Sequence, residues 1–262
     1  MSQLRISLIT VSFNSAKTIA QTIESVLAQD YPNIEYIIID GASTDGTQDI
    51  VKQYAHNITI FKSEPDKGIY DAMNKGIQLA TGDLIGMLNA DDVYANEKVI
   101  SLVAKCFENN AVDACYGDLI YFQDKEPNKV LRYWKSSDFK RGLFSKGWCP
   151  PHPTFFVRRK IYLQYGLFNT DYPMGNDVEL MMRFLEKERI QSRYIPTVLV
   201  KMRAGGVSNK SMRNIFIQNK SILQAARALN VPFSLFQFIV GKVFSRCWQF
   251  IQKPHVGENY VK

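Results

Sequence analysis

The stretch IEYIIIDGASTDGT, residues 34–47, runs from an apolar segment straight into a polar turn. Five of its first six residues are apolar and most of these are β-branched, which is typical of a strand buried on both faces. Asp40 follows this strand, and a helix is predicted from Thr47 to Tyr54. A strand, a polar loop and a helix in this order predict one unit of an α/β sheet.

The same alternation continues on either side of this stretch. Strands are predicted over residues 6–13, 58–61 and 84–88, and helices over 19–27 and 70–80. Regular alternation of this kind favours a mainly parallel sheet that helices flank on both faces.

After about residue 110 the pattern becomes less regular. Strands are predicted over 114–122, 130–134 and 194–202, and a helix over 178–185. Residues 148–153 contain three prolines, so we expect a rigid loop there rather than a helix.

Composition excludes several classes of protein. The chain has 262 residues, of which 46% are hydrophobic and 22% charged, and these proportions exclude a disordered or collagen-like chain. Its four cysteines form no C-x-x-C pair, which fits a reducing cytosol better than a zinc site or a disulfide framework. No signal peptide and no uncharged run of ~20 apolar residues is visible, so a cytoplasmic location is expected.

The net charge of +7 is concentrated at the C-terminal end. Residues 201–262 contain ten Lys or Arg and one acidic residue, whereas residues 1–200 contain 22 basic and 24 acidic residues. Two basic helices are predicted from Ser211 onward, separated near Pro232. Such an asymmetry suggests that the C-terminal part meets an anionic partner.

Three polar clusters follow predicted strands: residues 10–14, the loop from Asp40, and residues 89–92. In parallel sheets, ligands bind beyond the carboxyl ends of the strands. Asp91 and Asp92 are hard oxygen ligands suited to Mg²⁺ or Mn²⁺, which would leave coordination positions for diphosphate oxygens. The alternative is that this pair caps a following helix.

Two phosphate-binding motifs are absent from the sequence. It contains neither G-x-x-x-x-G-K-[ST] nor G-x-G-x-x-G after the first strand, which disfavours an ATP-driven motor and a hydride-transfer enzyme. A nucleotide bound without a glycine-rich loop needs a metal on its diphosphate and carboxylates on its base and ribose.

Five segments, in order and at the right spacing, resemble the signature of family 2 glycosyltransferases: residues 10–15, 25–29, 39–47, 63–76 and 82–92. The resemblance covers roughly residues 4–205. It implies a GT-A fold, a nucleotide-sugar donor, a divalent metal (Mn²⁺ or Mg²⁺) and inversion at the anomeric carbon. Residues 1–210 would then form the catalytic domain and residues 211–262 a basic helical extension.

The resemblance also assigns residues to the donor site. Asp40 matches the carboxylate that bonds the nucleobase, and Asn89-Ala90-Asp91 occupies the metal motif with Asn in place of its first Asp. Asp91 and Asp92 would hold the metal. The remaining donor-binding residues that it implies lie below the nucleoside, over the base and sugar, or toward the ribose: Thr10, Ser12, Asn14, Lys67, Asp71 and Asn89.

Asp177, in the segment 175–179, matches the catalytic base of the family. A carboxylate within hydrogen-bond reach can take the proton of a sugar hydroxyl as the new bond forms. The predicted helix begins here, and its dipole favours the ionised carboxylate. The alternative role of Asp177 is that of a helix cap.

Four further residues have two interpretations each. His152 matches a segment near the acceptor site or makes a structural hydrogen bond, and Arg203 folds over the diphosphate with the loop 205–208 or belongs to a solvated basic surface. Trp134 and Trp148 are expected in the core rather than under a sugar.

The leading hypothesis is an inverting glycosyltransferase that moves a sugar from a nucleoside-diphosphate sugar to a hydroxyl of a glycan or lipid-linked oligosaccharide in cell-surface polysaccharide synthesis. One alternative is a sugar-phosphate nucleotidylyltransferase, although its glycine-rich loop after the first strand is missing. Another is a basic nucleic-acid-binding protein, although no nucleic-acid motif is visible and we expect no such partner.

Residues 231–251 are rich in Phe, with Lys242 and Arg246 among the apolar residues and Lys253 just beyond. A helix in the membrane interface, with its basic residues toward anionic lipid, accounts for this pattern. The protein would then be peripheral on the inner face of the plasma membrane. The alternative is that the apolar surface packs on the catalytic domain or in a homodimer. The predicted stripe consists of Leu235, Phe236, Ile239, Val240, Val243, Phe244, Trp248 and Ile251.

Overall fold

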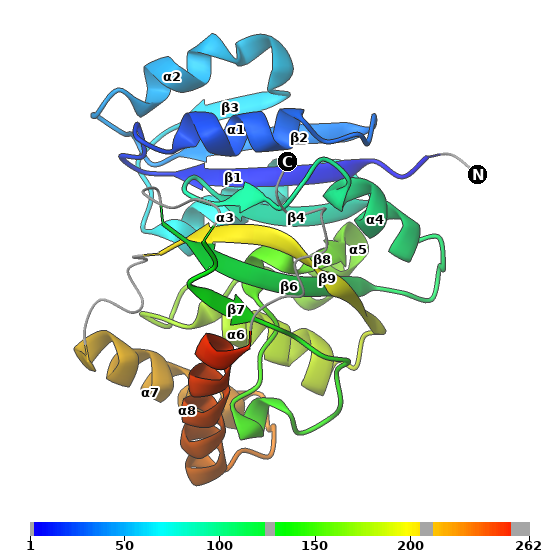
Figure 1. The fold of residues 1–262 in the computed structure, drawn as a ribbon, viewed down its shortest axis with the longest axis vertical. Coiled ribbons are helices and arrows are strands. Elements are labelled where there is room, and N and C mark those ends of the chain that lie inside the picture. Colours follow the sequence, from blue (N-terminus) through cyan, green and yellow to red (C-terminus); the bar gives the residue numbers. More distant parts are fainter. Residues whose placement is uncertain (1–2, 124–128, 205–211, 253–262) are drawn as a thin grey trace.

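The computed structural model describes residues 3–123, 129–204 and 212–252. Within them, one nine-stranded sheet has the order β3-β2-β1-β4-β8-β6-β9-β5, and β7 pairs with β6 (Figure 1). The strands are β1 (Ile6–Ser12), β2 (Ile34–Asp40), β3 (Ile60–Ser63), β4 (Leu84–Asn89), β5 (Val93–Tyr94), β6 (Ala114–Phe122), β7 (Arg132–Trp134), β8 (Phe156–Arg158) and β9 (Ser192–Arg203).

Helices cover both faces of this sheet, as the sequence predicts. They are α1 (Ile19–Leu27), α2 (Thr47–Gln53), α3 (Ile69–Leu79), α4 (Val99–Cys106), α5 (Arg159–Tyr165), α6 (Asn176–Met182), α7 (Met212–Ala228) and α8 (Leu235–Ile251), with short turns η1 (Ala55–Asn57), η2 (Phe144–Lys146), η3 (His152–Thr154) and the π-helical η4 (Arg183–Lys187). One core lies under α1, α2 and α4, and the other under α3, α5, α6 and α7. Because side chains alternate along β1, Ile6 and Leu8 enter the first core and Ile9 and Val11 the second.

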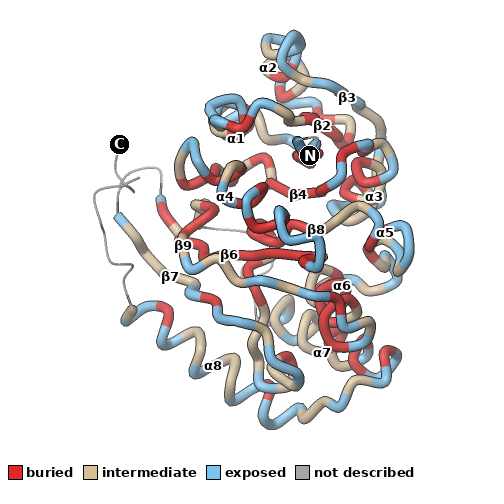
Figure 2. Tube along the Cα trace, turned by 90° about the vertical axis from the view of Figure 1, so that its right-hand side faces the viewer, coloured by how far each residue is buried: buried red, intermediate tan, exposed pale blue. Residues whose placement is uncertain are grey.

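The first half of the sheet is parallel, which places its polar strand ends together. β1 lies between β2 and β4, with Ser12 opposite Asp40 and Val11 opposite Asn89. The three predicted polar clusters therefore meet at one edge of the sheet. Figure 2 shows β4 and β6, in the middle of the sheet, mostly in the colour of buried residues.

The second half differs more from the sequence-based expectation. β8 pairs antiparallel with both β4 and β6, and neither it nor α4 or α5 is predicted from the pattern. Residues 148–153 are predicted as a loop. In the structure their last two residues begin η3, a 3₁₀ helix of one turn. Proline is tolerated in a first helical turn because the amide hydrogen that it lacks is not used there.

The two predicted C-terminal helices are present and pack on the rest of the molecule. α7 packs on α6 and buries Ile222, Ala225 and Ala226, and α8 packs on η2 and β7. The predicted boundary at residues 210 and 211 lies outside the described residues. Among the described helices, none has the length and hydrophobicity needed to cross a membrane.

Candidate active site

Asp40, at the end of β2, is fully buried. Its carboxylate accepts hydrogen bonds from Ser12 Oγ (2.9 Å), Ser63 Oγ (2.7 Å), and the backbone N (2.9 Å) and Oγ (2.5 Å) of Ser43. In this structure Asp40 therefore holds the ends of β1, β2 and β3 together. A bond from this carboxylate to a nucleobase remains a prediction.

The three residues predicted below the nucleoside have different positions. Thr10 of β1 is fully buried, and its hydroxyl lies 3.1 Å from the hydroxyl of Tyr36 of β2, so its side chain lies inside the molecule, below the strand ends. Ser12 bonds Asp40. Asn14 has a positive φ of 49° and accepts a bond from Thr44 N through Oδ1 (3.0 Å), which ties the first loop to the second.

The segment before α3 carries Lys67 and Asp71. Asp71 Oδ2 accepts a hydrogen bond from Lys67 N (3.1 Å) and lies 3.5 Å from Lys75 Nζ. Asp66 in the same loop approaches the β2 end closely, because a Cβ built on Gly41 would be 2.5 Å from Asp66 Oδ2. Asp66 thus lies beside the end of β2, where the nucleoside is predicted to bind. The sequence analysis did not single out this carboxylate.

Asn89, Asp91 and Asp92 form the cluster at the end of β4. Asp92 is fully buried and accepts bonds from Asn89 Nδ2 (3.2 Å) and Arg203 N (3.4 Å). The segment continues into β5, so the idea that Asp91 and Asp92 cap a following helix is wrong.

The electrostatics of this cluster favour a cation. Burial raises the pKa of Asp91, and burial together with the charge of Asp91 raises the pKa of Asp92 well above its usual value. Asn89 Oδ1 is buried and has no hydrogen-bond partner within the part of the chain that the structure describes. A divalent metal would neutralise the two carboxylates and satisfy this oxygen, so these residues fit Mn²⁺ or Mg²⁺.

Arg203, at the end of β9, contacts the same cluster and is half-buried. Its Nε donates to Asp91 O (3.3 Å) and its guanidinium lies 5.1 Å from the centre of the Phe122 ring. The loop 205–208, predicted to fold over a diphosphate, lies outside the described residues.

His152 connects this cluster to Asp177. His152 Nε2 lies 3.4 Å from Asn89 Nδ2, and His152 Nδ1 lies 3.4 Å from Asp177 Oδ2. Burial lowers the pKa of His152 below its usual 6.5, although the charges of Asp177 and Asp91 oppose this. A neutral imidazole therefore lies between the predicted metal residues and the predicted base.

Asp177 is the second residue of α6, and no side chain caps that helix. The cap interpretation of Asp177 is therefore wrong. Its Oδ1 accepts a hydrogen bond from the Tyr70 hydroxyl (3.1 Å), and burial and the nearby carboxylate raise the pKa of Tyr70 well above its usual value. Tyr70 thus remains protonated and donates to Asp177, a contact that helical periodicity alone does not reveal.

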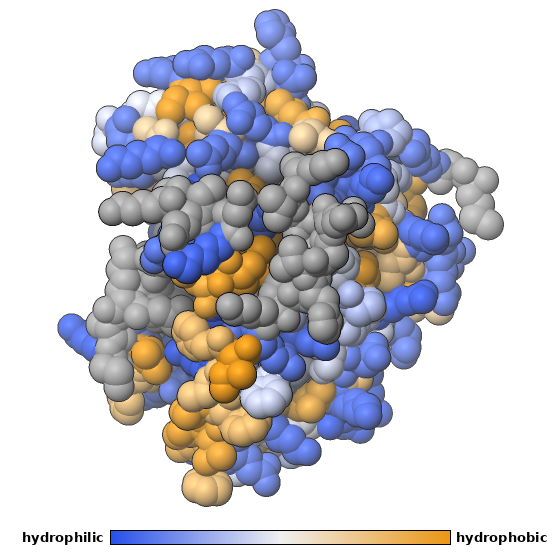
Figure 3. Space-filling view, viewed as in Figure 1, coloured by the Kyte–Doolittle hydropathy of each residue, from blue (hydrophilic) through white to orange (hydrophobic). Residues whose placement is uncertain are grey.

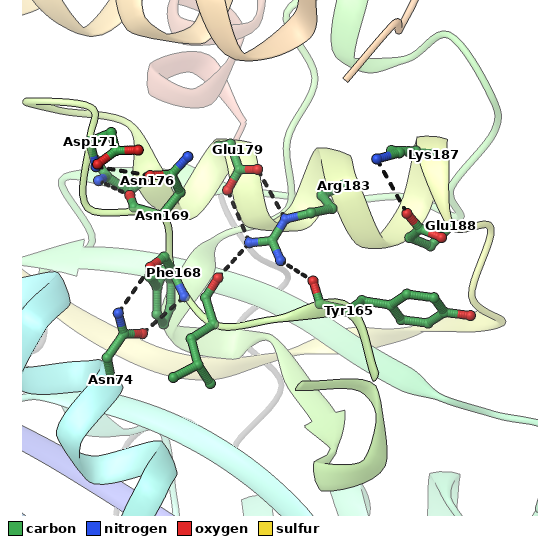
Figure 4. A network of polar contacts seen from close by, with 11 residues as sticks. Asn74, Tyr165, Phe168, Asn169, Asp171, Asn176, Glu179, Arg183, Lys187 and Glu188 are labelled. Atoms are coloured by element: carbon green, nitrogen blue, oxygen red, sulfur yellow. Dashed lines mark hydrogen bonds and ion pairs between the residues drawn. The ribbon is translucent and has the colours of Figure 1, made fainter. Parts of the chain in front are cut away.

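A polar network fixes the position of α6 (Figure 4). Arg183 forms an ion pair with Glu179 (3.0 Å) and donates to the carbonyl oxygens of Tyr165 and Leu167. Asn176 donates to the carbonyl oxygens of Asn169 and Tyr172. These bonds anchor both ends of the helix, so Asp177 is held on a rigid element.

The same network reaches the helix that carries Tyr70. Asn74 of α3 exchanges two hydrogen bonds of 2.9 Å with the backbone of Phe168 (Figure 4). Asp177 and His152 line a pocket whose other walls are mainly methionine and aromatic side chains. Trp134 and Trp148 pack at the edges of the two cores, as predicted.

A protein-family model for "Glycosyl transferase family 2" matches residues 7–166. The chain belongs to this family. A PGL/p-HBAD biosynthesis glycosyltransferase of Mycobacterium tuberculosis is 30% identical over 217 residues, 81% of this chain and 82% of the relative. The putative glycosyltransferase EpsE of Bacillus subtilis is 29% identical over 243 residues, 90% of this chain and 86% of the relative. The family 2 glycosyltransferase thus has relatives that match most of its length.

Solved structures support the fold. The mannosyltransferase PcManGT from Pyrobaculum calidifontis, in complex with GDP-Man and Mn²⁺, superposes with a TM-score of 0.64 at 19% identity, covering 96% of this chain and 73% of that one. S. aureus TarS in complex with UDP-GlcNAc gives a TM-score of 0.65 at 14% identity, covering 92% of this chain and 71% of that one. The predicted GT-A fold is confirmed.

Proposed function

We propose that this glycosyltransferase moves a sugar, with inversion, from a nucleoside-diphosphate sugar to a hydroxyl of a glycan or lipid-linked acceptor in cell-surface polysaccharide synthesis. Residues 1–210 would form the catalytic domain and 211–262 a helical extension. The observation that carries the proposal is the connection of Asp177 through His152 to the Asn89–Asp92 cluster. The predicted base and the predicted donor-phosphate site would therefore lie on either side of His152.

In this proposal Asp177 accepts the proton of the acceptor hydroxyl while that oxygen attacks the anomeric carbon from the side opposite the leaving group. Tyr70 and His152 fix the orientation of the carboxylate through its two oxygens. One oxygen of Asp177 must exchange its contact for the acceptor hydroxyl, and the 3.4 Å contact with His152 is the weaker of the two.

Asp91 and the free oxygen of Asn89 would hold the metal, with Asp92 contributing negative charge from behind. When bound, Mn²⁺ or Mg²⁺ supplies Lewis-acid stabilisation of the departing diphosphate. Arg203, which bonds Asp91, brings a guanidinium that pairs well with phosphate oxygens.

Two comparisons support the proposed function. The solved neighbours carry GDP-Man and UDP-GlcNAc in their names, which favours a nucleoside-diphosphate sugar donor here. The mycobacterial relative is named for PGL/p-HBAD biosynthesis, so a biosynthetic role is proposed here as well. A lipid-linked acceptor would be met at the inner face of the plasma membrane by a cytoplasmic protein.

A panel of nucleotide sugars with Mn²⁺ tests this function. We expect one class of donor to raise the melting temperature and to release nucleoside diphosphate when acceptor is added, with the opposite anomeric configuration in the product. Asp177→Asn is the matched control, because it should bind the donor without transfer. Release of pyrophosphate from a nucleoside triphosphate would instead identify a nucleotidylyltransferase.

A further inference from the structure

Helix α8 presents an apolar surface to solvent instead of to the core. Phe236 is 78% exposed, Phe244 69% and Ile251 70%. Figure 3 shows hydrophobic atoms gathered over this helix. We call this the outer face of α8, and its other members are Ile239, Val240, Val243 and Phe250.

The opposite, inner face of α8 carries the small and polar residues. Gly241 lies against η2 so closely that a Cβ there would be 1.8 Å from Lys146 O. Lys242 Nζ donates to Asn219 Oδ1 (2.7 Å) and Gln218 Oε1 (3.2 Å) of α7, and the buried Gln249 accepts from Arg132 Nε of β7 (2.6 Å). These contacts fix the rotation of α8, so its outer face cannot turn into the core.

Cations lie along the inner edge of α8. Lys242 and Arg246 are one turn apart, and Arg132 joins the helix at Gln249, less than one turn further. Lys242 and Arg132 bond amide oxygens, and within the described residues neither forms an ion pair with a carboxylate. Burial and the charge of Arg246 lower the pKa of Lys242. The same two causes lower the pKa of Arg132. Basic residues concentrated along one edge of the helix favour an anionic partner.

We propose that α8 docks on a bilayer that contains anionic phospholipid, with its outer face among the acyl chains and Lys242, Arg246 and Arg132 toward the negatively charged headgroups. This deepens the proposed function, on which it rests, by placing the acceptor side of the site at a lipid surface. A helix of 17 residues with aromatic side chains on its apolar side has the composition of an interfacial helix.

The charge pattern favours lipid over a second copy of the chain. Residues 212–252 contain five basic residues and no acidic one. A twofold pairing of α8 with α8 would bring its own cations together, because such interfaces join identical surfaces. An anionic bilayer meets both the charge and the apolar surface.

The docking surface is close to the catalytic site. Gln218 of α7, which accepts a hydrogen bond from Lys242 Nζ, also packs on Gly175, two residues before Asp177. A phosphate held at Lys242 would therefore keep the sugar of a lipid-linked acceptor near the base.

Flotation of the full chain with vesicles tests the proposal. We expect binding to phosphatidylcholine vesicles that contain phosphatidylglycerol and little binding to phosphatidylcholine alone. Phe236→Ser combined with Phe244→Ser should abolish binding, while Leu163→Ser, an equally exposed apolar residue on α5, should bind as wild type. Lys242→Gln with Arg246→Gln should weaken binding roughly 30-fold, at about 1 kcal/mol for each basic residue.

Each other outcome counts against the proposal. Failure of the wild type to float, or unchanged flotation of the Phe236/Phe244 variant, would overturn it, as would a wild-type dimer that this variant converts to a monomer. Inorganic phosphate alone is the probe for a free anion, and its full competition with vesicles would replace the lipid by a soluble phosphate. Donor-induced thermal stabilisation, measured in parallel, reports the proposed function separately from lipid binding.

Discussion

Asp40 lies at the end of a strand and Asp177 at the start of a helix, and the surroundings of these two carboxylates differ. Asp40 is fully buried and accepts four hydrogen bonds. The Asp177 side chain is 17% exposed, accepts one hydrogen bond and contacts one imidazole. A carboxylate whose oxygens are all bonded organises the chain around it, whereas one with unused capacity can take a proton from a substrate.

The same difference separates the two sides of the site. The β1–β4 side is a parallel sheet end closed by serine and asparagine bonds between its loops. The His152–Asp177 side has longer contacts and a pocket next to it. We therefore expect changes on the first side to cost stability and donor affinity, and changes on the second to cost rate.

Asp177→Asn gives the largest expected effect. Loss of a general base costs on the order of 10²- to 10⁴-fold in transfer rate. We expect little change in donor affinity, because Asp177 contacts the Asn89–Asp92 cluster only through His152. Measuring the transfer rate and, by titration, the donor affinity of both proteins checks this prediction. Turnover at the wild-type rate by a folded variant would remove Asp177 from the mechanism.

Asp91→Ala should weaken metal-dependent donor binding by roughly 10- to 100-fold. Chelation of the metal should have a similar effect on the wild type and little further effect on the variant. Thermal stabilisation by donor, with and without Mn²⁺, measures both. Equal stabilisation in EDTA and in Mn²⁺ would contradict a metal at this cluster.

Asp40→Asn and Asp66→Asn separate a supporting carboxylate from a ligand. Asp40→Asn should lower the free energy of unfolding by about 2 kcal/mol, because hydrogen bonds to a charged acceptor are lost in a buried place. Asp66→Asn should leave stability unchanged and lower donor affinity about tenfold. Denaturant unfolding and donor titration measure these two effects. A loss of donor affinity in Asp40→Asn, with Asp66→Asn unchanged, would support the predicted contact of Asp40 with the base.

Tyr70→Phe should lower the transfer rate about five- to tenfold, the cost of one hydrogen bond to the base, with donor affinity unchanged. Transfer rates of the two proteins at saturating donor check this. Ala substitution at Phe216, an exposed aromatic residue of α7, serves as a control for aromatic loss elsewhere. A Tyr70→Phe variant with the wild-type rate would leave this tyrosine a packing role only.

The smallest expected effect concerns pH and vesicle binding. The pKa of Lys242 is lowered to about 8 by burial and then by Arg246, so this lysine is cationic below that pH and neutral above it. Binding to anionic vesicles should weaken roughly fivefold from pH ~7 to ~9, the value of one lysine at such a surface. Lys242→Gln should remove most of this pH dependence. If vesicle binding of the wild type and of the variant changes equally with pH, another group causes the dependence.

The sequence predicts the donor side of this molecule well. Strand runs such as residues 34–40 are buried on both faces, so their composition alone identifies them, and parallel pairing then brings Asp40 and Asn89 to one edge. The apolar pattern of residues 178–185 predicts a helix start at Asp177, the predicted base, and the structure has the helix there.

The other side depends on contacts between distant segments. Tyr70 and Asp177 are 107 residues apart, and no local pattern signals their hydrogen bond. The hydrogen bonds that Asp40 accepts from Ser12 and Ser63 could not be predicted either, because these serines come from other strands. The three-residue strand β8 is too short to show a period.

Gly175, which precedes α6, has a φ of 81° and packs on α7, where a Cβ would lie 3.2 Å from Ile222. The family match ends at residue 166, before this contact. A chimaera that exchanges acceptor preference between relatives therefore needs to transplant α6, α7 and α8 as one block, and a junction placed at the end of the family match keeps that block whole.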